Sequence, residues 1–588
     1  MARWIIALAC TWLVTPVVGV FLETYKDAKD AYDYIIVGGG TAGLTVADRL
    51  SESGQHSVLV VEFGYLDGQR PGQTLYSITS APSPELGNRT FSVDIGCVVG
   101  GSSAVNGMIF QRGTAADYDI WGELAPLNNT WSWENILPYF KKGIQLTPPK
   151  PEIPADFNVK YDMKYWGSNY SDHSIFATYP NYLNPRTYPY YQTVKGIPGV
   201  NIIEDSGSGK TGLSYWMSST NPKTGLRSYA RAGHWDGLNR SNYDLLTGAR
   251  VNRILFNETT ATGILLTPRN ANHSFSITAR HEVIISAGAI HTLQVLQLSG
   301  IGPAPLLKAA GIPVLVDLPG VGSNFQDHSY TTASFRFSTP PAIPASLLSQ
   351  SQSITPDNLG RAGLGLSLPL SAITPNYTSL AARLLAQDPA SHLPAGAHPT
   401  VVAGYRRQME MFAREWSNST SSFSTLRFSF PGTPDFTPVN IHPVSRGTVL
   451  INPANPESEP IVDYRGASNP IDVDLAVESI KFLRRIMNSG ELAKHNATEL
   501  SPGRRWDSDE KLREWVRRES VPSVYHPVGT AAMMRREWGG VVDGELRVYG
   551  VTGLRVVDAS VMGVIVGGTT SMSVYALAEK GADLIRGV

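Results

Sequence analysis

One stretch near the N-terminus constrains the fold more than any other part of the sequence. The apolar run Tyr34–Val37 is typical of a β-strand, and helical periodicity resumes a few residues later. Three glycines stand between them in the pattern Gly38-x-Gly40-x-x-Gly43. Such glycines make a tight turn, let the backbone approach a pyrophosphate and allow close helix packing, while the helix N-terminus faces the negative charge. The stretch therefore predicts a dinucleotide site.

A second strand adds an acidic residue to this prediction. The apolar run 57–61 ends on Glu62, which follows the glycines at about the 20-residue spacing expected of a βαβ nucleotide unit. An acid at this place takes the ribose hydroxyls of the adenosine half, although the pattern does not choose between NAD and FAD. The predicted cofactor contacts of this unit are Gly38, Gly40, Thr41, Ala42, Gly43 and Glu62.

Size and charge narrow the class of protein. With 588 residues, 42% of them hydrophobic, the chain can bury a large core and form more than one domain, or one domain with long insertions. A formal net charge of −1 lacks the basic excess that nucleic-acid binding requires, so we expect a small-molecule ligand and no nucleic acid. The 55 glycines and 40 prolines favour a loop-rich globular fold over a helical one.

Residues 1–19 predict a secretory signal peptide. Arg3 precedes the apolar run 4–14, and small residues continue to Gly19. The alternative is an uncleaved membrane anchor, but the apolar run is short for a span and no charged cluster follows it directly. We therefore expect a mature chain that begins near Val20 and has no membrane span.

The glycosylation sequons and the cysteines agree with passage through the secretory pathway. Because Cys10 lies in the predicted signal, the mature chain keeps only Cys97 and can form no internal disulfide. We expect an N-glycosylated protein that is secreted or lies in the lumen of the secretory pathway. The nine N-x-[ST] sequons are at Asn88, Asn128, Asn169, Asn239, Asn257, Asn272, Asn376, Asn418 and Asn496.

The segment 96–113 carries a family resemblance. Its adjacent glycines, two serines and nearby Asn106 can pack flat against a planar ring and donate hydrogen bonds to it. The segment resembles the first signature of the glucose-methanol-choline (GMC) oxidoreductases, flavoproteins that oxidise alcohols with FAD. In some members a His before this Asn is bonded to the flavin, and Val105 at that position implies non-covalent FAD. The cofactor contacts implied here are Gly100, Ser102, Asn106, Gly107 and Met108.

Three further segments resemble the family. Residues 288–302 are similar to its second signature, although Leu293 replaces the usual proline. Residues 324–328 also match, and we interpret His328 as a hydrogen-bonded structural histidine rather than a catalyst. The resemblance implies an adenine contact from the backbone around Val251. It also implies that Asp558 and Ala559 line the flavin, and that the N-terminus of the next helix stabilises the reduced ring.

The catalytic prediction rests on the segment 525–530. His526 matches the family's catalytic histidine, and an imidazole suits the removal of a hydroxyl proton while hydride leaves for flavin N5. The family's second active-site residue is His or Asn, six residues before the helix tyrosine. Here the tyrosine is Tyr575 and the position holds Thr569, which can hydrogen-bond but cannot share a proton as His does. We expect no metal.

The predicted fold class is α/β, with a Rossmann-like FAD-binding domain and a substrate domain built on an antiparallel sheet with helices. The FAD-binding domain is assigned to 31–130, 241–330 and 520–588, and the substrate-binding domain with its insertions to 131–240 and 331–519. Strands are expected at 245–256, 281–287, 426–430 and 447–451, a hairpin turn at 442–447, and a helix over 569–580.

The aromatic-rich stretch 161–191 admits two readings. It is either a surface insertion packed by its own aromatic side chains or a lid over an aromatic substrate. The second reading favours a small, planar alcohol as the substrate, with oxygen or another molecule as electron acceptor.

Two functions follow. The first is an FAD-dependent alcohol oxidase or dehydrogenase of secondary metabolite biosynthesis, with His526 as base. The second is a redox-neutral cyclase or dehydratase, resembling versicolorin B synthase, that keeps FAD as a scaffold.

Overall fold

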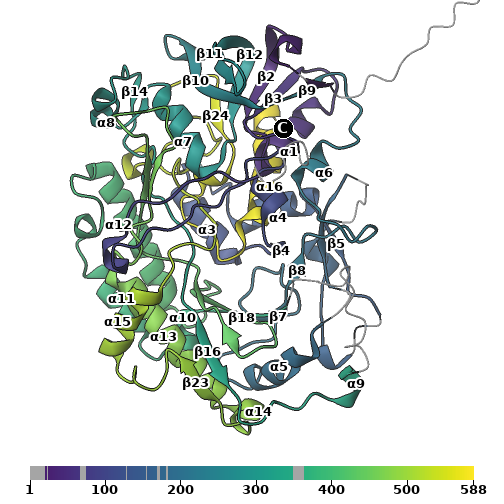
Figure 1. Cartoon of the computed structure of the whole chain (residues 1–588), viewed down its shortest axis with the longest axis vertical. Helices are drawn as coiled ribbons and strands as arrows, with labels where there is room; N and C mark the ends of the chain where they lie inside the picture. Colours follow the sequence, from purple (N-terminus) through teal and green to yellow (C-terminus); the bar gives the residue numbers. More distant parts are fainter. Residues whose placement is uncertain are drawn as a thin grey trace, which may run out of the picture.

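The computed structural model shows a mixed α/β protein (Figure 1). The predicted signal peptide and the sequons at Asn128 and Asn169 lie outside the described residues. In the ranges that the structure does describe, no helix is long and apolar enough to cross a membrane. These ranges are 20–22, 24–66, 74–126, 129–151, 153, 155–167, 173–180, 183–348 and 363–587.

An eight-stranded sheet forms the upper part of the molecule in Figure 1. The strand after the glycine turn, β3, pairs in parallel with the strand before it, β2, in the register Tyr34 opposite Val58. Both strands are almost wholly buried, which explains their continuous apolar runs. The strands in spatial order are β1 (Val20–Leu22), β9 (Tyr243–Thr247), β3 (Val58–Glu62), β2 (Ala31–Val37), β12 (Phe275–Ile285), β11 (Thr260–Pro268) and β10 (Ala249–Asn257), with β24 (Leu554–Val556) also paired to β12.

The predicted single strand over 245–256 is wrong. The structure divides it into β9, parallel to β3, and β10, antiparallel to β11. The break falls at Gly248, whose φ of +64° is a conformation that glycine adopts without strain. The predicted strand over 281–287 is the last part of β12, which ends at Ile285.

A five-stranded antiparallel sheet lies in the lower half of Figure 1. Its strand β18 has the predicted bounds, and its neighbour β17 pairs with it in the register Leu366 opposite Phe428. The strands in spatial order are β15 (Ser329–Tyr330), β20 (Val439–Asn440), β18 (Leu426–Phe430), β17 (Leu364–Leu368) and β7 (Gly212–Tyr215).

The segment 442–447 does not close a hairpin, so that prediction is wrong. The strand before it belongs to the five-stranded sheet, whereas the strand after it, β21 (Thr448–Leu450), pairs with β22 (Ile461–Asp463). Arg446 explains the path of the chain. Its guanidinium is buried and donates to the carbonyl of Pro443 and to Oε1 of Gln408, so the chain folds around this side chain between two sheets.

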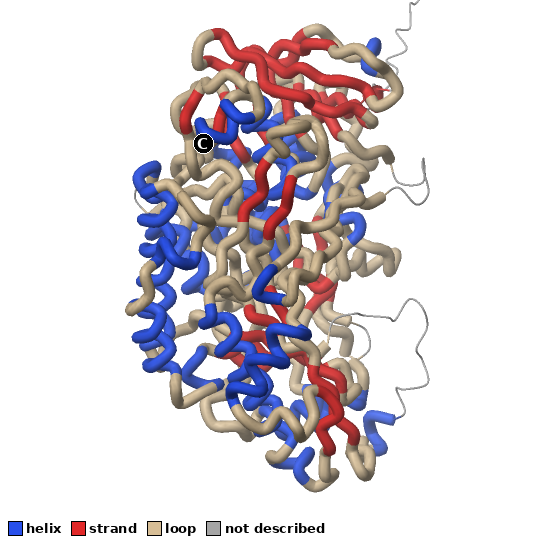
Figure 2. The backbone as a smooth tube through the Cα atoms, turned by 60° about the vertical axis from the view of Figure 1, so that its left-hand side comes forward, coloured by secondary structure: helices blue, strands red, loops and turns tan. Residues whose placement is uncertain are grey.

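Shorter sheets and helices complete the fold, with helices along the flank of the lower half in Figure 2. The remaining strands are β4 (Ile109–Phe110), β5 (Ile144–Thr147), β6 (Ile175–Thr178), β8 (Met217–Ser218), β13 (Ile301–Gly302), β14 (Val316–Asp317), β16 (Ala333–Arg336), β19 (Asp435–Phe436) and β23 (Thr498–Ser501). The helices are α1 (Thr41–Ser51), α2 (Ser102–Val105), α3 (Ala115–Leu124), α4 (Trp133–Gly143), α5 (Tyr188–Val194), α6 (Ala230–His234), α7 (Gly288–Leu298), α8 (Ala304–Ala309), α9 (Ala345–Leu348), α10 (Leu370–Ile373), α11 (Tyr377–Leu385), α12 (Pro399–Ser417), α13 (Pro470–Met487), α14 (Gly490–Ala493), α15 (Asp509–Glu519) and α16 (Thr570–Arg586).

The aromatic-rich insertion packs inward. Trp166, Tyr179, Tyr190 and Tyr191 are buried and belong to the main hydrophobic core. Tyr190 also stacks on Phe430 of β18 at a ring-centroid distance of 5.8 Å. The aromatic side chains therefore pack against the rest of the core, including β18, and not only against one another.

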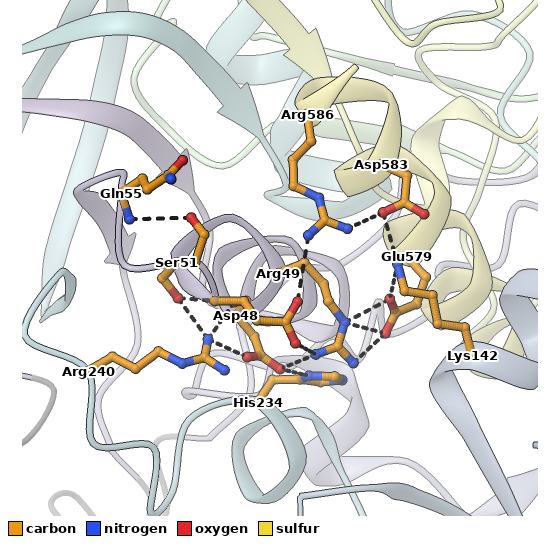
Figure 3. Close-up of polar contacts among 12 residues, drawn as sticks. Asp48, Arg49, Ser51, Gln55, Lys142, His234, Arg240, Glu579, Asp583 and Arg586 are labelled. Carbon is orange, nitrogen blue, oxygen red and sulfur yellow. Dashed lines mark hydrogen bonds and ion pairs between the residues drawn. The ribbon is translucent and has the colours of Figure 1, made fainter. Parts of the chain in front are cut away.

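A cluster of charged side chains joins α1 to α16, which lie side by side (Figure 3). The guanidinium of Arg49 donates to both carboxylate oxygens of the fully buried Glu579, at 2.8 to 3.0 Å. The neighbouring Asp48 lies 2.8 Å from Nδ1 of His234 and 2.6 Å from Nη1 of Arg240. We call this the α1–α16 charge cluster; it comprises Asp48, Arg49, Glu52, Lys142, His234, Arg240, Glu579, Asp583 and Arg586.

Candidate active site

The predicted glycine turn connects β2 to α1. Gly38 has a φ of +107°, and a Cβ there would lie 2.5 Å from the carbonyl oxygen of Ser286 in the neighbouring chain segment. A Cβ at Gly43 would lie 1.9 Å from the carbonyl oxygen of Gly38. Gly40 is the N-cap of α1, and Thr41 and Ala42 form its first turn, whose N–H groups lack partners within the helix. This turn has the shape and the donors that a pyrophosphate requires.

Glu62 lies beside the glycine turn, at the carboxyl end of β3. One carboxylate oxygen accepts the N–H of Gly39 and the other accepts that of Gly64, each at 2.7 Å. Burial raises the pKa of Glu62 to about 7, against the lowering effect of these two hydrogen bonds. The side chain is therefore fixed beside the glycine turn, at the place where the ribose contact is predicted.

Glu62→Ala is expected to lower FAD affinity by on the order of 1.5–3 kcal/mol, because a charge-assisted ribose contact is lost. Titration of the apoprotein with FAD, followed by flavin fluorescence, measures this change. Glu62→Gln is the matched control, since its amide oxygen keeps one acceptor in place and the loss should be smaller. FAD affinity at the wild-type level in Glu62→Ala would mean that another residue holds the ribose.

The second predicted cofactor segment lies directly against the glycine turn. The N–H of Gly100 donates to the carbonyl of Gly39 at 2.8 Å. A Cβ at Gly101 would lie 2.8 Å from Cα of Gly40, so the two loops approach at a distance that only glycine permits. The fold thus brings together two motifs that are separate in the sequence.

Of the remaining residues of this segment, Ser102 begins α2 and the others follow it. Asn106 fixes the chain there, because its Oδ1 accepts the N–H of Met108 at 3.0 Å and Nη1 of Arg227 at 2.6 Å. Met108 has a φ of +65°, a left-handed conformation that is uncommon outside glycine and concentrated at functional sites. Ser102 and Gly107 are exposed, so both are accessible to a ligand.

Val251 lies in β10 at the end of the strand order, and Asp558 follows β24, which pairs with β12. Val251 is buried in β10, whose start is tied to the Glu62 region by the hydrogen bond from Gly248 N to Gly64 O at 3.0 Å. The carboxylate of Asp558 accepts the N–H groups of Gly288 and Ser560, at 2.9 and 2.8 Å.

Asp558 also accepts the hydroxyl of Thr292 at 2.5 Å. Its carboxylate therefore anchors the start of α7, and a cofactor contact at Asp558 or Ala559 would use the main chain. Burial raises the pKa of Asp558.

His526 lies in a tight loop that is hydrogen-bonded to the residue after Asp558. Its Nδ1 is 2.9 Å from Nδ1 of His328, and its main-chain N–H donates to Oδ1 of Asp327 at 3.0 Å. Burial, with a further contribution from the positive charge of Arg427, lowers the pKa of His526 to about 4. The hydrogen bond from Gly529 N to Ala559 O, at 3.3 Å, joins this loop to the segment that contains Asp558. A neutral imidazole, the form that can accept a proton, is thus placed beside the cofactor residues.

Thr569 is the N-cap of α16, but its side chain does not cap the helix. The hydroxyl instead accepts the N–H of Gln111 at 3.1 Å and donates to the carbonyl of the same residue at 3.3 Å. Its described partners are main-chain atoms, and it forms no hydrogen bond with His526 among the described contacts. The structure thus gives Thr569 a role in joining α16 to the first signature segment.

The segment before α16 is held by three residues that the sequence analysis did not assign to the site. The guanidinium of Arg427 donates to the carbonyl of Gly567. The main-chain N–H of Gly567 donates to Oδ2 of Asp117 at 2.9 Å. Nε2 of His442 lies 2.9 Å from Oδ1 of Asp117, and both side chains are buried. His442 does lie in the segment 442–447 that was predicted as a turn, whereas the sequence analysis distinguished neither Asp117 nor Arg427.

In the described part of the chain, no three His, Cys, Asp or Glu side chains are grouped so that they could hold a metal ion.

Together, a parallel sheet, a glycine turn with an acid beside it, a second glycine loop and a half-buried, neutral histidine define a Rossmann-like oxidoreductase. Family models described as GMC oxidoreductase match residues 32–330 and 443–578. The chain belongs to the GMC oxidoreductase family, and the predicted α/β fold class with an FAD-binding Rossmann-like domain is confirmed.

Relatives match the chain over nearly its whole length. "Dehydrogenase xptC" of Emericella nidulans is 37% identical and covers 96% of this chain and 95% of its own length. A "GMC oxidoreductase family protein Mala s 12" of Malassezia sympodialis is 32% identical, with 95% and 93% covered. The solved structure of a fungal aryl-alcohol oxidase matches with a TM-score of 0.88 at 35% identity, covering 95% of this chain and 99% of that one.

Proposed function

We propose that this protein oxidises the alcohol group of a small organic substrate with FAD as cofactor and His526 as general base. The observation that carries the proposal is the placement of a half-buried imidazole of low pKa beside the predicted cofactor residues. The likeness to a fungal aryl-alcohol oxidase and to a dehydrogenase supports this class of reaction.

FAD bound in this cradle would supply the hydride acceptor. The chain's own residues fit such a cofactor: the glycine turn leaves room for a pyrophosphate, and Glu62 is fixed beside it. His526 takes the proton of the substrate hydroxyl, and the positive N-terminus of α16 favours negative charge nearby. Val105 stands where a linking His would be, so the bound FAD is non-covalent. The residues proposed to hold FAD are Gly38, Gly40, Thr41, Ala42, Gly43, Glu62, Gly100, Ser102, Asn106, Gly107, Met108, Val251, Asp558 and Ala559.

Anaerobic addition of candidate aryl, sugar and short aliphatic alcohols tests the reaction. Bleaching of the yellow flavin with formation of the carbonyl product supports oxidation, and acid treatment should then release all of the flavin from the precipitated chain. Product formation with a flavin that stays oxidised would overturn the proposal.

A redox-neutral cyclase or dehydratase is the second candidate. The observation in its favour is Thr569, which replaces the His or Asn of the usual pair and whose hydroxyl is bonded to the main chain of Gln111. Such an enzyme would keep FAD as a scaffold and use His526 as a base without net oxidation. The same anaerobic experiment separates the two candidates.

The biosynthetic and cellular roles are further parts of the proposal. A role in secondary metabolism is proposed for this oxidation, and the relatives include proteins named as dehydrogenases. The seven sequon asparagines within the described ranges are all exposed, which supports N-glycosylation in the secretory pathway. Treatment with a glycosidase should lower the mass of the secreted protein, and an intact Met1 without a mass shift would place it elsewhere.

The assignment of the two domains is proposed with the same boundaries as in the sequence analysis. The eight-stranded sheet would hold the cofactor, and the five-stranded antiparallel sheet would face the substrate.

A further inference from the structure

We propose that His328 is a positioning residue that fixes the tautomer of His526, so that Nε2 of His526 is the atom that accepts the substrate proton. This inference rests on the proposed function, because it names the basic atom of the proposed base. It replaces the interpretation of His328 as a merely structural histidine.

The first step concerns the proton on His328. Its Nε2 lies 3.0 Å from the carbonyl oxygen of Val566. A carbonyl oxygen can only accept a hydrogen bond, so Nε2 of His328 must carry a proton. A neutral imidazole has one N–H, and therefore Nδ1 of a neutral His328 presents a lone pair.

The second step is that His328 is neutral. Its side chain is buried, and burial is the main cause that holds its pKa well below the usual value. The groups that face it carry or can acquire positive charge: His526 from its own loop, His442 from the 442–447 segment and Arg427 from β18. A second proton on His328 would be repelled by the fixed positive charge of Arg427.

The third step passes from His328 to His526. Their two Nδ1 atoms are 2.9 Å apart, and a hydrogen bond between them requires that one donates. Since Nδ1 of His328 is the acceptor, Nδ1 of His526 carries the proton. The neutral His526 then has its lone pair on Nε2, which makes that nitrogen the base.

The main chain of His526 is held by the residue next to His328. Oδ1 of Asp327 accepts the N–H of His526, while Oδ2 accepts the hydroxyl of Ser523 at 2.7 Å. The rings of His328 and His526 are nearly perpendicular, at 84°, with centroids 5.0 Å apart. Asp327 and His328 therefore fix both the position of the loop and the orientation of the ring.

Two variants of nearly equal shape separate an acceptor from a space-filling side chain. His328→Asn keeps an oxygen close to the position of Nδ1, whereas His328→Leu offers no acceptor. Stopped-flow measurement of anaerobic flavin reduction should show His328→Asn within about 10-fold of wild type and His328→Leu slower by about 10²-fold, approaching the loss of the base itself. Equal rates in the two variants, whether both fast or both slow, would overturn the proposal.

A measurement on the unaltered chain provides an independent readout. In ¹⁵N-histidine-labelled wild-type holoenzyme near pH 7, the ring signals of His526, assigned from their absence in His526→Ala, should report a protonated Nδ1 and an unprotonated Nε2. The reverse assignment would overturn the proposal even if His328→Leu failed to fold.

Different outcomes would contradict the role of His526 as the base and the role of His328 as its positioning residue. Wild-type flavin reduction in His526→Ala would remove the proposed base, whatever His328 does. Slow reduction in His526→Ala together with wild-type rates in both His328 variants would leave the base in place and remove the positioning role alone.

Discussion

The His526→Ala enzyme is expected to bind FAD and to reduce it about 10²–10⁴ times more slowly than wild type, the range usual for loss of a general base. The FAD should remain because the described contacts of the imidazole are to His328, not to the glycine turn or Glu62. Stopped-flow absorbance under anaerobic conditions measures the rate, and the flavin spectrum measures occupancy.

His398→Ala is the control for this variant. His398 is exposed and caps α12, so its removal deletes an imidazole without changing the site. It should reduce flavin at the wild-type rate. Substrate turnover at the wild-type rate in His526→Ala would show that this residue is not the base.

The pH dependence follows from the lowered pKa of His526, about 4. Below this pH the imidazole is protonated and cannot accept the substrate proton, so flavin reduction should slow as pH falls through about 4. Above it the neutral form dominates, and this group causes no further change in rate. If the rate of flavin reduction instead fell near pH 6.5, the pKa of an unperturbed histidine, His526 would not be desolvated as the structure indicates.

Arg49→Leu is expected to destabilise the protein by about 3–5 kcal/mol, because it leaves the buried carboxylate of Glu579 without its main partner. Glu579 is fully buried, whereas its other cation, Lys142, is one-third exposed and lies 3.4 Å away. The midpoint of thermal unfolding, followed by protein fluorescence and by release of FAD, should fall clearly below that of wild type.

Two further variants test whether the buried Arg49–Glu579 pair accounts for the loss of stability. Arg586→Leu removes an ion pair at the exposed end of the same cluster and should cost only about 0–1 kcal/mol. The double variant Arg49→Leu/Glu579→Leu removes both charges and should recover much of the loss, since a buried ion pair contributes little beyond an apolar pair of similar volume. Equal midpoints for Arg49→Leu and Arg586→Leu would contradict the role assigned to the buried pair.

Local patterns predicted the cofactor part of the fold well. The strand, the glycine turn, the helix and Glu62 are neighbours in sequence, and their spacing alone specifies a βαβ unit. The break at Gly248 was missed because the residues on both sides of it are typical of strands, and one glycine does not by itself separate two strands. The course of the chain after His442 was missed because it depends on the burial of Arg446 against distant residues.

In the catalytic region, too, local motifs could be identified from the sequence, whereas contacts between distant residues could not. His526 could be identified from its motif, but its hydrogen bond to His328 joins residues far apart in the chain. Arg427 is one polar residue in an otherwise ordinary strand, and only the folded structure brings it to the carbonyl of Gly567. Thr569 was identified by its position in a motif, while its bonds to Gln111 could not be inferred from that position.

The arrangement of the first and last helices has a consequence for the order in which the chain matures. During synthesis β2, α1 and β3 leave the ribosome early, but β24, which completes one edge of their sheet, and α16, which carries Glu579, are made last. Until then Arg49 lacks its partner Glu579, and α1 lacks the helix that lies beside it. The large sheet is therefore completed only after the C-terminal segment has been made, and we expect stable uptake of the flavin to follow translation.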